Sequence, residues 1–226
     1  MTTEHIFWYP KKDISNRQGG TVINFSNLEK SSRYLLQNVH QVPVDLFTVA
    51  LTVSQYKQKP IHILKRPMRP SIEGLTVEDP HGYSEYFIII NSNHIRVRQR
   101  TTLAHEIAEI HLEQLKTGTI LNQLMQPNKK NESRAFALAK LLLVPSWFLR
   151  DTKELYGDDP AMMVKFISDH CHVSLNVACL RVNNAYPEYG YTLTFGKDTL
   201  FSYGVSDSMR QESLLEMGKY MLCGWC

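Results

Sequence analysis

The chain has 226 residues, of which 43% are hydrophobic, and this is enough to bury one substantial core. Its 25 basic and 22 acidic residues give a formal net charge of only +3, which does not indicate the basic surface of a nucleic-acid-binding protein. The N-terminal residues lack the pattern of a signal peptide, and the longest apolar runs are far shorter than a membrane-spanning helix of roughly 20 residues. We therefore expect a cytoplasmic protein that contacts no membrane and binds no nucleic acid directly.

The first 90 residues predict two short helices followed by a small sheet. Apolar residues at helical spacing predict helices over 28–40 and 44–56, separated by Val42-Pro43. The runs 61–64 and 86–90 are β-branched or aromatic and are bounded by turn-forming residues, as buried strands are. This combination places the chain in the α+β class.

Two further helices follow the second strand. The segment 97–115 has a wide apolar face, which predicts a central, largely buried helix that ends before Gly118. A second helix is predicted over 132–144, with Pro145 stopping it.

The C-terminal part predicts a helical pair, a hairpin and a last helix. Helices over 161–171 and 174–184, the second capped by Ser174, form a helix-turn-helix outline. Strands over 191–195 and 199–203 read as a hairpin that could extend the sheet, and a final helix covers 207–222. We divide the chain into a domain of residues 1–150 and a segment of residues 151–226 packed on it.

Three polar residues on the helix 97–115 form a candidate metal and catalytic site. His105 and Glu109 are four residues apart, so they lie side by side on one helix face and can bind one ion. The usual zinc-peptidase motif is H-E-x-x-H, in which the glutamate is the general base. Here Glu109 replaces the second histidine, Glu106 keeps the position of the base, and Glu132 at the start of the next helix is the candidate third ligand.

The residues around this motif resemble the ImmA/IrrE family of metallopeptidases, which have a zincin-like domain. The likeness is carried by the segment from Asn91-Ser92-Asn93 through Arg100 to Ala104-His105-Glu106, by Pro43-Val44-Asp45 and Glu73-Gly74-Leu75 before it, and by the later segments Glu132-x-x-Ala135 to Leu142-Leu143-Val144-Pro145 and Val173-Ser174 to Arg181-Val182. In that family the glutamate that corresponds to Glu132 of this chain is the third zinc ligand.

The resemblance implies a cytoplasmic zinc peptidase that cleaves or inactivates a helix-turn-helix repressor of the Xre type, in phage, mobile-element or stress control. Two positions depart from the family pattern, because Glu109 stands in place of histidine and Phe136 in place of asparagine. A site with one histidine and two carboxylates binds zinc less tightly and admits manganese or iron as alternatives.

Two other functions stay open. The first is a catalytically inactive relative that binds a repressor or a toxin-antitoxin partner without cutting it. The second is a DNA-associated regulator that uses residues 161–184, although that segment has only Lys165 and Arg181 as fixed positive charges.

The four cysteines all lie in the last quarter, and we interpret Cys171 and Cys179 as small buried residues. The pair Cys223 and Cys226 could form part of a second zinc site.

Overall fold

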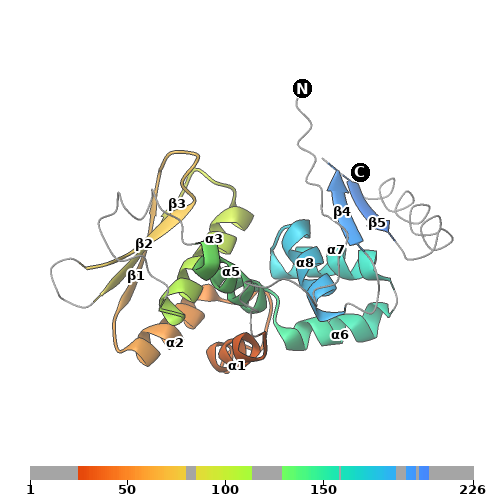
Figure 1. The fold of residues 1–226 in the computed structure, drawn as a ribbon, viewed down its shortest axis with the longest axis horizontal. Helices are drawn as coiled ribbons and strands as arrows, with labels where there is room; N and C mark the ends of the chain where they lie inside the picture. The colour runs from red at the N-terminus through yellow and green to blue at the C-terminus, as the bar shows by residue number, and fades with distance from the viewer. Residues whose placement is uncertain are drawn as a thin grey trace.

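The computed structural model describes residues 25–79, 85–113, 129–157, 159–186, 192–196 and 199–203. The helices are α1 (Phe25–Leu35), α2 (Leu46–Lys57), α3 (Arg96–His111), α5 (Lys129–Leu143), α6 (Ser146–Tyr156), α7 (Pro160–Cys171) and α8 (Leu175–Ala185). The strands are β1 (Ile61–Arg66), β2 (Gly74–Glu78), β3 (Tyr86–Asn91), β4 (Thr192–Gly196) and β5 (Thr199–Tyr203). In Figure 1, the sheet of β1, β2 and β3 lies at one end, helices α6 to α8 at the other, and α3 and α5 between them.

The main sheet has the strand order β1-β3-β2, with β1 parallel and β2 antiparallel to the central β3. Along β3 the buried residues Tyr86, Ile88 and Ile90 alternate with half-buried ones, so one face of the strand packs into the core. The two predicted strands correspond to β1 and β3. Strand β2, which was not predicted, lies at one edge of this sheet.

Helix α3 is the centre of the fold. All nine residues from Thr102 to Ile110 are buried, because α3 packs against α2, α5 and the sheet. This confirms the prediction of a central, buried helix. The helix ends at His111, before the predicted end, and Gly118 lies outside the described residues.

Helix α5 packs against α3 on one side and α1 on the other. It ends at Leu143, just before Pro145, as predicted. The same proline is the N-cap of α6, a helix that the sequence analysis missed. Leu149 of α6 is fully buried, and Phe148 and Tyr156 pack against the core as half-buried residues, so α6 is an amphipathic helix.

Helices α7 and α8 form the predicted helical pair. Ser174 accepts a hydrogen bond from the backbone N–H of Val177 at 3.3 Å, which confirms its role as the N-cap of α8. The two basic residues of this pair differ in exposure. Lys165 pairs with Asp169 at 3.2 Å, and the Arg181 residue is only 5% exposed. The buried Arg181 is not placed to contact a phosphate backbone, which leaves Lys165 as the one exposed basic residue of the pair.

Strands β4 and β5 form the predicted hairpin within one residue of its expected bounds. They pair with each other antiparallel, in a separate two-stranded sheet. The expectation that these strands extend the main sheet is therefore wrong: β4 packs beside α8, and α3 and α5 lie between this end of the molecule and the main sheet (Figure 1). The predicted last helix, over 207–222, lies outside the described residues. Among the described helices, none has the length and apolarity needed to cross a bilayer.

Candidate metal and catalytic site

Helices α3 and α5 bring three of the predicted site residues together. The Nε2 atom of His105 lies 3.6 Å from Glu109 Oε1 on its own helix and 3.2 Å from Glu132 Oε2 in the first turn of α5. His105 and Glu109 are buried, and Glu132 is half-buried. Each of the three residues offers one ligand atom, and these atoms lie within 4.8 Å of one another. No other group of this kind is found among the described residues.

This donor set fits a transition metal. Zinc binds histidine nitrogen and carboxylate oxygen at roughly 2.0–2.2 Å, so two donors on a tetrahedral ion lie about 3.4 Å apart. The two separations measured from His105 are close to that value. Two carboxylates and one imidazole also suit manganese or iron, since harder oxygen ligands favour those ions more than thiolates would.

Glu106 is held by a residue of the sheet. The hydroxyl of Thr76, on β2, donates a 2.7 Å hydrogen bond to Glu106 Oε2, and both residues are buried. This contact fixes one oxygen of the predicted general base from outside its own helix. Thr76 was not among the predicted site residues. Alternation of Leu75 and Val77 with Thr76 could have indicated the strand, but no sequence signal connects it to Glu106.

A glycine allows β2 to approach α3 this closely. A Cβ atom at Gly74 would lie 2.5 Å from the Cγ2 atom of Thr102 and 3.1 Å from the carbonyl oxygen of Ile89. A larger residue fits there only if the Thr102 side chain moves away and the backbone near Ile89 shifts slightly. Gly74 therefore sets the spacing that lets Thr76, two residues along the strand, reach Glu106.

Phe136 covers one side of the site. Its ring centroid lies 4.1 Å from that of His105, and the residue is 47% exposed. It lies one turn after Glu132 on α5, so it borders the candidate ligands and solvent at once. From the sequence, Phe136 was noted as a departure from the family pattern, and its contact with His105 was not predicted.

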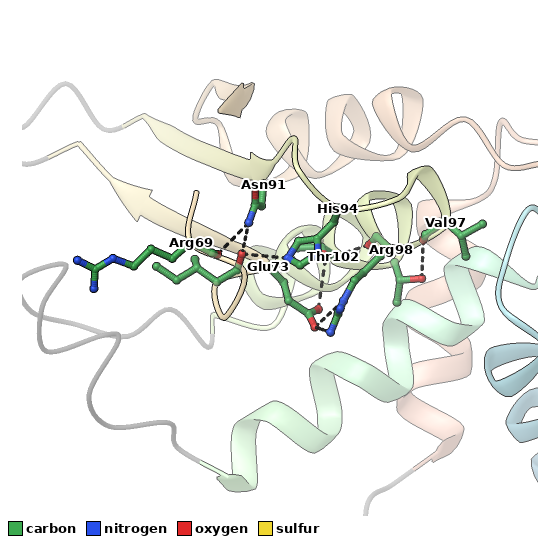
Figure 2. Close-up of polar contacts among 9 residues, drawn as sticks. Arg69, Glu73, Asn91, His94, Val97, Arg98 and Thr102 are labelled. Carbon is green, nitrogen blue, oxygen red and sulfur yellow. Dashed lines mark hydrogen bonds and ion pairs between the residues drawn. The ribbon is translucent and has the colours of Figure 1, made fainter. Parts of the chain in front are cut away.

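Two other histidines lie apart from the site. His94 has its Nε2 atom 3.3 Å from the carbonyl oxygen of Ile72 and belongs to a polar network at the start of α3 (Figure 2). His111 is half-buried beside Tyr56, with ring centroids 5.5 Å apart. Burial, and to a lesser degree the charge of Lys57, lowers the pKa of His111.

The network in Figure 2 fixes the loop before β2 onto α3. The fully buried Asn91 donates its amide hydrogens to the carbonyl oxygens of Met68, Arg69 and Ile72, at 3.3, 3.0 and 2.7 Å. At the end of that loop, Arg98 of α3 donates two hydrogen bonds to the same carboxylate oxygen of Glu73, at 3.0 and 2.6 Å.

The described cysteines are buried and unbridged, as predicted for Cys171 and Cys179. Burial raises the pKa of each thiol to about 12, so neither is a ready metal ligand or nucleophile. Cys223 and Cys226 lie outside the described residues.

A family profile for the peptidase M78 family, described as the IrrE N-terminal-like domain, matches residues 56–183. This span covers more than half of the chain and includes all four candidate site residues. The chain belongs to the peptidase M78 family. Membership supports a metal-dependent peptidase fold, and it agrees with the resemblance inferred from the residues around His105 and Glu132.

Structural comparison of the M78 protein gives a distant likeness. A Mycobacterium tuberculosis transcriptional regulator aligns with a TM-score of 0.48 and 11% sequence identity, over 70% of this chain. The alignment spans 46% of the length of that regulator. A search of curated proteins found no match.

Proposed function

We propose that this M78 protein is a cytoplasmic metal-dependent peptidase that cleaves one specific protein, a helix-turn-helix repressor of the Xre type, in phage, mobile-element or stress control. The observation that carries the proposal is the group of donor atoms from His105, Glu109 and Glu132, beside a glutamate fixed by Thr76. The peptidase site would belong to residues 1–150, and the division from 151–226 stays a prediction.

His105, Glu109 and Glu132 would hold the ion, with zinc as the expected metal and manganese or iron as alternatives. When bound, such an ion supplies Lewis-acid chemistry, which polarises a carbonyl oxygen and acidifies water. Glu106 is the proposed general base: its carboxylate accepts the proton of the attacking water and passes it to the leaving amine. The hydrogen bond from Thr76 keeps the Glu106 carboxylate in one orientation during both transfers.

Strand β2 is suited to hold an extended peptide beside Glu106. It is an edge strand, and no other described strand pairs with its outer side. An extended segment of a substrate could add there as a further strand through backbone hydrogen bonds. The scissile bond would then lie near Thr76, whose hydroxyl is hydrogen-bonded to Glu106, the proposed base.

Metal content tests the site itself. We expect about one ion per chain by elemental analysis of the purified protein, and loss of that ion in both His105→Ala and Glu132→Ala. Glu106→Gln removes the proposed base but no ligand, so it should keep the metal and abolish cleavage of the repressor. Retained cleavage in Glu106→Gln would refute the mechanism, and absence of metal after incubation with zinc or manganese would refute the site.

A second function is favoured by one observation, the carboxylate of Glu109 where the family pattern has a histidine. An inactive relative would bind a repressor or a toxin-antitoxin partner and leave it intact. For such a binder, complex formation would be the same for the wild type and Glu106→Gln, and the partner would stay uncut in both.

A further inference from the structure

Helices α1, α5, α6 and α8 line an open cavity of about 330 Å³ that is separate from the candidate metal site. This volume is in the range of small-molecule binding sites. Its polar lining comes from Glu29, Lys140, Ser146, Arg181, Asn184 and Tyr186. Asn184 is exposed, so the cavity is open to solvent on that side.

The cavity contains one acid and two bases. Ser146 donates its hydroxyl hydrogen to Glu29, with its oxygen 2.9 and 3.1 Å from the two carboxylate oxygens, and Arg181 Nη2 lies 3.5 Å from Glu29 Oε1. Arg181 also donates to the carbonyl oxygen of Val144 and the hydroxyl of Ser146, at 3.1 and 2.6 Å. The negative charge of Glu29 therefore neutralises the positive charge of Arg181. The positive charge of the second base is not neutralised by a carboxylate of the cavity.

That second cation is Lys140, which is half-buried on α5. Its ammonium group has no carboxylate or hydrogen-bond partner among the described residues. Burial, and then the nearby guanidinium of Arg181, lowers the pKa of Lys140, as expected for a charge without compensation. Arg181 has two further donors on Nη1 that no described residue accepts. An anion in the cavity would complement both groups.

The lining also defines the ligand's charge and shape. Two positive charges and one negative charge leave a net charge of +1, which matches a monoanion better than a dianionic phosphate. The remaining lining is apolar and comes from Ala137, Leu141, Leu149 and Ala185. We propose that this cavity binds a small monocarboxylate with an apolar tail, its carboxylate between Lys140 and Arg181. This proposal does not depend on the metal site or on peptidase activity.

The test uses the full-length protein with sodium hexanoate as the probe and hexanamide as its neutral counterpart, in ligand-observed NMR titrations. We expect saturable binding of hexanoate and much weaker binding of hexanamide and of inorganic phosphate. Lys140→Met keeps most of the side-chain length but removes the charge, so it should weaken hexanoate binding roughly tenfold or more, the loss of one charge-assisted hydrogen bond. Glu29→Gln should tighten binding, because it removes the carboxylate that repels the ligand.

The matched control is Lys165→Met, which removes the same charge from an exposed position on α7. It should leave hexanoate binding unchanged, whereas equal weakening by both lysine variants would mean non-specific attraction and overturn the proposal. Absence of saturable hexanoate binding, or equal binding of hexanoate and hexanamide, would overturn it as well. If phosphate bound more tightly than hexanoate, the inferred ligand class would be wrong.

Discussion

Thr76 and Glu106 are joined across two elements of the fold, because the hydroxyl on β2 donates a 2.7 Å hydrogen bond to the carboxylate on α3. Both residues are buried, so water cannot replace the bond easily. The proposed base is thus oriented by a strand that runs along the edge of the sheet.

We predict that Thr76→Val lowers the free energy of unfolding by about 1–3 kcal/mol, the cost of a buried carboxylate that loses a donor. Thr76→Ser keeps the hydroxyl and should restore most of that loss. Urea denaturation of the two variants and the wild type measures the difference, and metal content should be unchanged in both. Equal stability of the wild type and Thr76→Val would show that Glu106 does not depend on this bond.

The second prediction concerns the ligand that departs from the family pattern. Glu109→His should tighten zinc binding by on the order of tenfold, or about 1.4 kcal/mol, because imidazole suits zinc better than a second carboxylate does. Competition with a chromogenic chelator measures the affinity. Glu113→His places a histidine just beyond the end of the same helix, at a side chain that is 80% exposed, and should leave zinc affinity unchanged. If both variants behave alike, Glu109 is not a ligand.

The third prediction concerns the loop shown in Figure 2. Asn91→Asp replaces an amide that donates to three carbonyl oxygens with an oxygen that cannot donate when ionised. We expect a loss of about 3 kcal/mol or more in the free energy of unfolding, since the side chain is fully buried. Asn93→Asp is the control, because Asn93 is exposed and donates to one carbonyl oxygen of the same loop. A similar cost for the two variants would contradict the role of Asn91.

The fourth prediction concerns Cys171 and Cys179, whose thiol pKa is raised by burial from 9.0 to about 12. Alkylation with iodoacetamide at pH 8 should modify neither residue in the folded protein and both in denaturant, as read by mass spectrometry of their peptides. Because the folded pKa values exceed the unfolded ones, these thiols stabilise the fold below pH 9 and lose that contribution as the pH rises from 9 toward 12. Cys171→Ala should reduce this alkaline loss of stability. Rapid alkylation under native conditions would contradict the burial of these thiols.

The sequence was informative where chemistry and periodicity coincide. His105, Glu106 and Glu109 lie within five residues of one helix, so helical geometry alone predicts which side chains share a face. Glu132 was predicted from its position before an apolar stripe, and the structure brings its carboxylate within 3.2 Å of His105. Two helix boundaries were also predicted from backbone chemistry. Pro145 stops α5, and Ser174 caps the N-terminus of α8.

The contacts that depend on packing between distant segments were not predictable. Thr76 and Glu106 are 30 residues apart, and only the close approach at Gly74 brings them together. The cavity draws Glu29, Lys140 and Arg181 from three helices, and no local pattern relates them. Helix α6 is a different case, because its apolar residues Phe148, Leu149 and Tyr156 do carry an amphipathic pattern that the prediction overlooked.

Helix α5 carries Glu132 in its first turn and Lys140 eight residues later, so about 12 Å of one rigid helix separates the candidate metal site from the cavity. His105 and Glu109 belong to α3, and any displacement of α5 relative to α3 therefore changes the distance between Glu132 and its fellow ligands. An occupant of the cavity that shifted α5 would alter metal affinity, and the metal would alter the affinity of that occupant by the same factor.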